Sequence, residues 1–143
     1  MNINQASPFH LFCFVYIGFS NLSNQKLEEK DMNEIQRKIA IWMNVNFSNV
    51  VEFNLILHQS SEWYNHIKQQ EKLNSLLEVT RSIRELKELN QEDLKSFLSD
   101  IRDIAIANGR FNEDEKQLHD KIARELGINV MTSDKSFKKK LGY

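Results

Sequence analysis

Proline, glycine and cysteine are scarce in this 143-residue chain, which contains one proline, four glycines and one cysteine. Few prolines and glycines argue against many short strands joined by tight turns, and the abundance of Leu, Lys, Glu, Gln and Ile favours long helices. A single cysteine excludes a disulfide framework within the chain. Because Cys13 lies in the apolar run LFCFVYIGF, we expect a buried thiol in a reducing compartment, which predicts a cytoplasmic protein.

An excess of one charge is also missing, since 19 basic residues stand against 20 acidic residues and give a net charge of -1. The net charge of the whole chain does not attract nucleic acid or an anionic membrane, so we predict no nucleic-acid partner. The basic C-terminal tail, residues 131–143, gathers four lysines around Phe137. Such a tail can touch nucleic acid or anionic lipid, but a solvated chain end is the favoured interpretation.

Long hydrophobic runs are absent as well. The run from Leu11 to Phe19 is far shorter than the ~20 residues that cross a bilayer. No Lys or Arg precedes it and no small-residue cleavage pattern follows it, so we predict neither a transmembrane segment nor a signal peptide. Ser7 and Pro8 instead predict the start of a buried, central helix over residues 8–20.

The remaining hydrophobic residues recur mainly with helical spacing. We expect a loop over 20–30, a second helix that starts with a capping box at Asp31 and Glu34, and a third from Asn49 toward Ile67, in which Ser60 and Ser61 are a candidate interruption. A fourth is predicted over 71–89, a fifth after the cap at 90–93, and a sixth from 112 to a stop at 127. The fold class is therefore all-α, a compact bundle of about six to seven helices. One domain over 1–143 is expected, with a core over about 8–127.

The stretch NGRFNEDE, residues 108–115, resembles two different structural motifs. Asn-Gly often forms a hairpin turn, but hairpins need period-2 strands and both flanks here have a period near 3.6. A calcium-binding EF-hand loop with Gly109 at its sixth position would place Ile104 and Ile106 where carboxylates are required. The stretch is therefore predicted to join two helices.

Helix capping by itself accounts for the acidic residues that follow. Asn112 as N-cap and Glu115 three residues later satisfy backbone amides, and Glu113 and Asp114 favour the positive end of the helix dipole. Each such contribution is on the order of 0.3 to 1 kcal/mol. No other chemistry stands out, because the glycines are never clustered and the four histidines, His10, His58, His66 and His119, form no zinc-binding pair at i, i+4.

A helix, a turn and an acidic-capped helix occur twice, over about 14–43 and 101–128. A shift of about 83 residues places Asp31 on Asp114, Ile35 on Leu118 and Met43 on Leu126. This pattern is typical of an internal duplication of a helix-turn-helix pair.

The second copy resembles the TerB-like family of helical domains, which is associated with tellurite resistance and is also found attached to J-domain co-chaperones. The family pattern is an Ala-Asp-Gly turn, a Glu six residues after the glycine, and a helix that ends in Leu-Gly. Ala107-Asn108-Gly109, Glu115 and Leu126-Gly127 match it, and the resemblance covers about residues 9–127. It implies an all-helical domain without an established reaction, whose acidic residues gather near two turns and bind a divalent cation or a basic partner. Asn108 stands where the family usually has Asp, which predicts a weaker metal site.

The leading hypothesis is a non-enzymatic TerB-like binding or adaptor domain in the stress response to tellurite or metal. Its acidic surface would take a divalent cation (calcium, magnesium or zinc) or a protein partner, and requires the two turns to lie close together. The candidate residues are Asn108, Asn112, Glu113, Asp114, Glu115, Asp31 and Glu34. Two alternatives stay open: a hydrolase or transferase with a pocket of dispersed His and Asp residues, and a purely structural interaction domain. The sequence does not indicate an oligomeric state.

Overall fold

The fold is known from a computed structural model, which describes residues 1–24, 27–107, 109 and 111–129. Within these residues the chain forms helices and no strand, so the all-α prediction is confirmed. The elements are the 3₁₀ helix η1 (Ile3–Gln5), α1 (Pro8–Asn24), α2 (Glu29–Met43), α3 (Val50–His66), the 3₁₀ helix η2 (Gln69–Glu71), α4 (Lys72–Arg84), α5 (Gln91–Ile106) and α6 (Glu113–Glu125).

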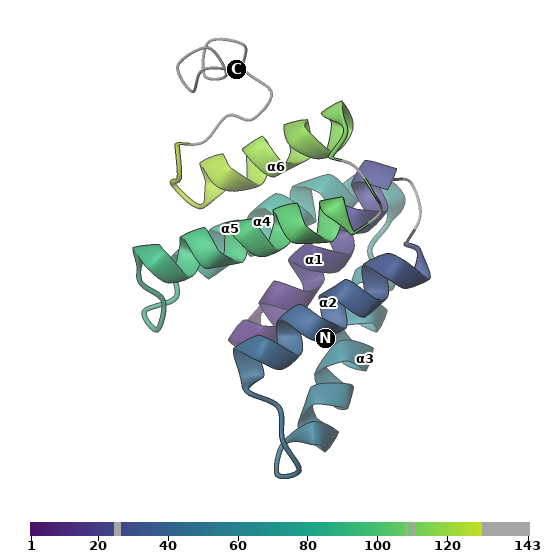
Figure 1. Cartoon of the computed structure of the whole chain (residues 1–143), viewed down its shortest axis with the longest axis vertical. Coiled ribbons are helices and arrows are strands. Elements are labelled where there is room, and N and C mark those ends of the chain that lie inside the picture. Colours follow the sequence, from purple (N-terminus) through teal and green to yellow (C-terminus); the bar gives the residue numbers. More distant parts are fainter. Residues whose placement is uncertain (25–26, 108, 110, 130–143) are drawn as a thin grey trace.

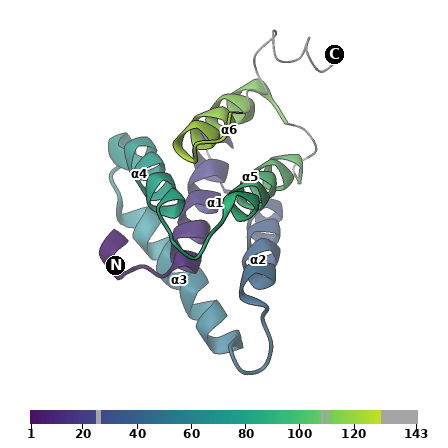
Figure 2. The same cartoon turned by 90° about the vertical axis from the view of Figure 1, so that its left-hand side faces the viewer.

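Helix α1 is the centre of the bundle, as predicted, and contacts each of the other five α-helices. Helices α3 and α4 pack on one side of it, α2 and α5 lie on the other, and α6 crosses its C-terminal end (Figures 1 and 2). All residues from 10 to 20 are buried. This explains why α1 is apolar around its whole circumference and not along one stripe.

Aromatic side chains and one glycine bring the neighbouring helices onto α1. The ring centroid of Phe14 lies 4.2 Å from that of Trp63 and 5.4 Å from that of Tyr64, so these two aromatic residues belong to the core, as expected. A Cβ atom at Gly18 would lie 3.0 Å from Leu76 Cδ1 and 3.2 Å from Tyr64 Cε1. The absence of a side chain at Gly18 therefore lets α3 and α4 approach α1 closely.

Several predicted helix boundaries are wrong. Residues 20–24 continue α1 and do not form a loop, because Leu22 still packs against the core. Helix α2 begins at Glu29, so Asp31 is its third residue and not its N-cap. Helix α3, by contrast, reaches His66 as expected and runs through the candidate interruption at Ser60, which is buried. Helix α4 ends at Arg84, five residues before the predicted end, and Leu86 and Leu89 pack on the core from the connection that follows.

The predicted caps of the last two helices are confirmed. The side chain of Asn90 accepts a hydrogen bond from Asp93 N at 2.8 Å, which begins α5. Gly127 follows α6 with a φ of 77°, a left-handed conformation that favours glycine. The amides of Gly127 and Ile128 donate to the carbonyls of Arg124 and Ala123, which is the Schellman arrangement. Among the described helices, none combines the length and the apolar character needed to cross a bilayer.

Candidate functional site

The capping box of α6 uses two of the predicted site residues. Asn112 Oδ1 accepts from Glu115 N at 2.8 Å, and Asn112 N donates to Glu115 Oε1 at 3.0 Å. The Glu115 side chain is buried, with 1% of the residue exposed. These two residues therefore begin the helix, as the capping interpretation predicted, and Glu115 does not face solvent.

Asp31 has the corresponding position in α2. It is fully buried, and its Oδ2 accepts from Glu28 N at 3.0 Å. Both Asp31 and Glu115 are third residues of their helices. The caps of the two repeats are thus related by a shift of 84 residues (115 minus 31), so Asp31 matches Glu115 and not Asp114.

The other candidate residues fall into three places. Glu34 Oε1 lies 2.6 Å from Arg37 Nη2 and 3.6 Å from Lys38 Nζ, on the part of α2 that faces α5. Asn108 lies outside the described residues. Glu113 and Asp114, at the start of α6, are exposed. The acidic surface near α6 that a ligand can reach therefore consists of Glu113 and Asp114 among the described candidates.

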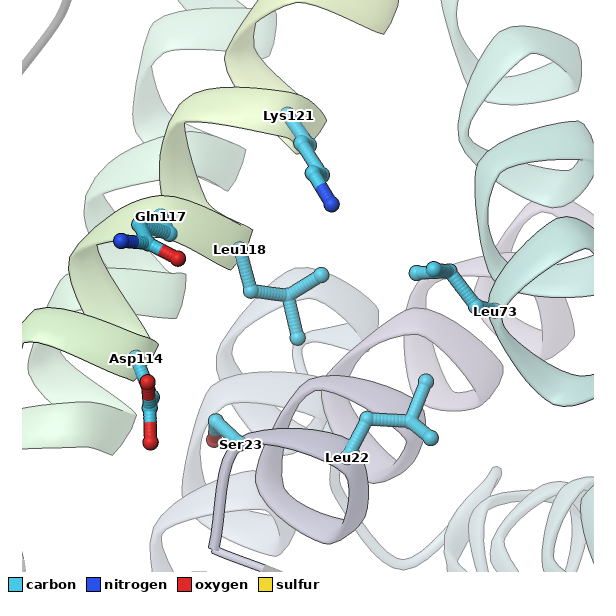
Figure 3. Close-up of a pocket in the computed structure, with 7 residues that line it drawn as sticks. All are labelled: Leu22, Ser23, Leu73, Asp114, Gln117, Leu118 and Lys121. Carbon is cyan, nitrogen blue, oxygen red and sulfur yellow. The ribbon is translucent and has the colours of Figure 1, made fainter.

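Asp114 lies on the rim of a surface groove between the C-terminal end of α1, the start of α4 and α6. The groove has a volume of about 270 Å³ and is lined by Leu22, Ser23, Leu73, Asp114, Gln117, Leu118 and Lys121. Its three leucine side chains point toward one common space (Figure 3). Ser23 lies in the last turn of α1 and Asp114 in the first turn of α6, so the groove brings together the helix ends that flank the two repeat turns. Residues 25, 26, 108 and 110 of these turns lie outside the described residues, and a site shared by the two turns stays a prediction.

The groove combines an apolar floor with two opposite charges. Asp114 and Lys121 are seven residues apart on α6, a separation of about 10 Å along a helix axis. A volume of about 270 Å³ is at the lower end of small-molecule pockets and can take one large side chain of a partner. Leu22, Leu73 and Lys121 were missed as site residues, because only the folded arrangement brings α1, α4 and α6 together.

A second polar cluster joins α1, α2 and α5. Asp100 Oδ2 accepts from Tyr16 Oη at 2.6 Å and from Trp42 Nε1 at 2.8 Å. Burial raises the pKa of Asp100, and the two hydrogen bonds and the nearby ammonium of Lys38 oppose that rise. Burial also raises the pKa of Tyr16 well above its ordinary value, and the charge of Asp100 adds to this effect. Tyr16 is therefore a neutral hydrogen-bond donor at neutral pH.

Lys38 is the cation of this cluster and faces three carboxylates. Its Nζ lies 2.6 Å from Asp103 Oδ2 and 3.6 Å from both Asp100 Oδ1 and Glu34 Oε1. Burial opposes the charged form, but the hydrogen bond to Asp103 and the three negative charges outweigh it and raise the pKa of Lys38. With 10% of its side chain exposed, Lys38 fits a structural ion-pair network between α2 and α5.

An enzyme of the kind considered above would require a histidine beside a carboxylate in a pocket. One such pair, His58 with Glu62 at 3.1 Å, is exposed on α3, and another, His119 with Asp120, is buried. His119 Nδ1 lies 3.2 Å from Asp120 Oδ1, and the ring of His119 packs edge-on against Phe111. Burial lowers the pKa of His119, and Asp120 opposes this effect, so the imidazole is neutral at neutral pH. Neither residue lines the groove on α6. This placement fits a packed polar pair of the core.

Neither a metal-binding cluster nor a related protein assigns a function to these residues. Within the described ranges, no group of three or more His, Cys, Asp or Glu residues is arranged to hold a metal ion. Comparison with protein-family models, with curated proteins and with solved structures finds no match. Membership in the TerB-like family therefore stays a prediction from the motif around residues 107–127.

Proposed function

We propose that this domain is a non-enzymatic binding or adaptor domain and that the groove between α1, α4 and α6 takes a segment of a protein partner. The observation that supports this proposal is the apolar floor that Leu22, Leu73 and the largely buried Leu118 form beside Asp114 and Lys121. Apolar pockets with a few polar groups at their edge are the usual form of peptide-binding sites.

The groove suits an amphipathic helix that presents one large apolar side chain between a basic and an acidic residue. The apolar residue would fill the space between the three leucines. The basic residue would lie beside Asp114 and the acidic residue beside Lys121, about two helical turns apart. Charges at the rim contribute little affinity but select the partner, because a like charge at either position is repelled.

This proposal narrows the acidic surface expected from the sequence. Glu113 and Asp114 are available at the start of α6, whereas Asp31 and Glu115 are buried. A protein partner is favoured over a divalent cation because the described residues offer no group of three ligands. A role in the response to tellurite or metal rests on the TerB-like motif alone and stays a prediction.

Helical peptides of about 15 residues test the proposal by fluorescence anisotropy. Each carries a central Leu with flanking residues placed for the two rim positions: one Lys and one Glu, two Lys, or two Glu. The wild-type chain should bind the mixed peptide about 1.4 to 5 times more tightly than the others, because one exposed ion pair contributes about 0.2 to 1 kcal/mol. Asp114→Lys should change the preference to the Glu-Glu peptide, and Lys121→Glu to the Lys-Lys peptide.

One further variant tests the floor of the groove, and a second serves as the control. Leu73→Lys places a charge at the apolar floor and should abolish binding, since Leu73 is 36% exposed and its replacement leaves the core intact. Glu92→Lys reverses an exposed charge on α5, outside the groove, and should leave the order of the three peptides unchanged. Saturable binding whose order is the same in all variants would contradict the assignment of this groove. The absence of saturable binding by any peptide would contradict the proposed partner chemistry.

A further inference from the structure

The connection between α2 and α3 displays large apolar side chains to solvent. Five of the nine exposed large hydrophobic residues in the described part of the chain lie between residues 41 and 55, which we call the hairpin tip. Phe47, in the loop, is 102% exposed, and Val51, near the start of α3, is 78% exposed. The other members are Ile41, Val50 and Leu55. An exposed apolar patch of this kind marks an interaction surface.

Hydrogen bonds hold the loop of the hairpin tip in one conformation. Asn49 Oδ1 accepts from Asn46 N at 2.8 Å, and Asn46 Oδ1 accepts from Ser48 N at 2.8 Å. Asn49 Nδ2 donates to Met43 O at 3.2 Å. These polar groups already have hydrogen-bond partners within the loop. A partner that covers the loop would therefore bury few donors that lack a hydrogen bond. Phe47 is thus presented on an ordered loop, which lowers the entropic cost of docking.

The charge of the hairpin tip selects its occupant. Residues 41–51, IWMNVNFSNVV, contain no Asp, Glu, Lys, Arg or His. No Lys or Arg occurs between Lys38 and Lys68, so the tip lacks the basic residues that attract an anionic membrane. In a twofold pair the same patch meets itself, and a charge at the twofold axis would face its own copy. Glu52 is the one ionisable residue of the hairpin tip, and it lies beside the uncharged stretch 41–51. That stretch can pack against its counterpart in a second copy without bringing charges into contact.

The exposed area is close to what a stable dimer requires. With about 150 to 200 Å² for each whole side chain, the exposed fractions of the five residues amount to roughly 550 Å² per copy. Two copies would bury at most about 1,100 Å² from these residues, and the uncharged polar residues around them would add to it. Specific interfaces begin near about 1,200 Å² in total.

We propose that two copies of this chain form a twofold dimer through the hairpin tip, residues 41–55. The tip lies at the end of the bundle opposite α6 (Figures 1 and 2). A dimer of this form leaves the α6 grooves of both copies uncovered and pointing away from the interface. The resulting pair would be a bivalent adaptor, a consequence that rests on the proposed function of the groove, whereas the dimer itself does not.

Sedimentation equilibrium of the full chain, from about one to several hundred micromolar, tests the dimer. We expect a reversible monomer–dimer equilibrium that changes little between low and high salt, because residues 41–51 carry no charge and Glu52 is the one charged residue of the tip. Phe47→Ser and Val51→Ser should each weaken association at least tenfold. Both positions are exposed, and circular dichroism verifies that the fold is retained. Ile106→Ser is the matched control, since Ile106 is 50% exposed on α5, and should associate like wild type.

A crosslinking experiment locates the interface independently. Cys13 is buried, so a thiol reagent on the folded chain reacts with an introduced cysteine. A short bis-maleimide should couple Ser48→Cys into dimers efficiently and Lys95→Cys, on the exposed face of α5, hardly at all. A wild-type chain that stays monomeric over the whole concentration range would overturn the proposal. A dimer that Phe47→Ser and Val51→Ser leave unaffected would overturn the location, and neither result depends on whether the groove binds peptides.

Discussion

Replacement of Lys38 by Met removes the cation that faces three carboxylates, while it keeps most of the apolar stem. Lys38 Nζ lies 2.6 Å from Asp103 and 3.6 Å from Asp100 and Glu34. Asp100 and Glu34 expose 16% and 17% of their side chains, so water compensates only partly for the lost charge. We expect Lys38→Met to destabilise the fold through repulsion among acids that have lost their common partner.

The expected loss is about 2 to 3 kcal/mol at pH 7. Two unit charges at 3.6 Å attract by about 4 to 5 kcal/mol at an effective dielectric constant of about 20. Desolvation of the ammonium opposes this gain, and Asp103, which exposes 44% of its side chain, is screened by solvent. The net value therefore lies between the 0 to 1 kcal/mol of an exposed pair and the 3 to 5 kcal/mol of a fully buried one.

Urea unfolding followed by circular dichroism measures this loss. Lys95→Met is the matched control, because Lys95 Nζ also lies 3.6 Å from a carboxylate, that of Glu92, but both side chains are mainly exposed. The control should lose less than about 0.5 kcal/mol. If Lys38→Met is no less stable than Lys95→Met, the ion-pair network does not hold α2 against α5 and the reasoning is refuted.

The same variant should respond to pH in one direction. Burial raises the folded-state pKa of Asp100 above 3.8, and removal of Lys38 raises it further. A carboxyl group with a raised folded-state pKa stabilises the fold at low pH, and this contribution is lost as the pH rises through that pKa. The difference between wild type and Lys38→Met should therefore be small in acid and grow toward pH 7.

Three further outcomes are expected. Gly127→Ala should lose about 1 to 2 kcal/mol, measured as a lower melting temperature, because Gly127 has a φ of 77°; equal stability would exclude strain at this position. Asn112→Ala should lose about 1 kcal/mol in urea unfolding and Asn112→Asp much less, since Asp retains the capping oxygen; equal losses would exclude a capping role. Burial raises the pKa of Cys13 from 9.0 to about 12 and that of Tyr64 from 10.0 to about 12, so the free energy of unfolding should fall as the pH rises from 9 toward 12. Cys13→Ala should reduce that fall by up to about 4 kcal/mol at pH 12, and an unchanged slope would contradict it.

Local signals in the sequence predicted those parts of the fold that depend on neighbouring residues. The caps at Asn90 and Asn112 need only residues within one helical turn, and both are confirmed. The end of α1 and the start of α2 were predicted wrongly because residues 20–30 lack an apolar period. Leu22 is held by contacts with other helices, which no local pattern reports.

In the candidate site, too, the residues that depend on local signals could be predicted and those that depend on the packing of distant helices could not. Asp114 could be identified because it is one of the acidic residues in the first turn of α6, and it lines the groove. Leu73 and Lys121 could not, since they reach the groove from helices whose packing depends on the whole fold. The pair of Lys38 and Asp100 is separated by 62 residues (100 minus 38), so spacing along the chain gives no indication of it.

NMR titration of the full chain with the mixed Lys–Leu–Glu peptide tests the central claim most directly. We expect saturable shifts at the methyl groups of Leu22, Leu73 and Leu118 and at the amides of Asp114 and Lys121, with none at the hairpin tip. Saturable shifts confined to another face, or no shifts with peptide in large excess, would contradict the claim that the groove between α1, α4 and α6 is the binding site.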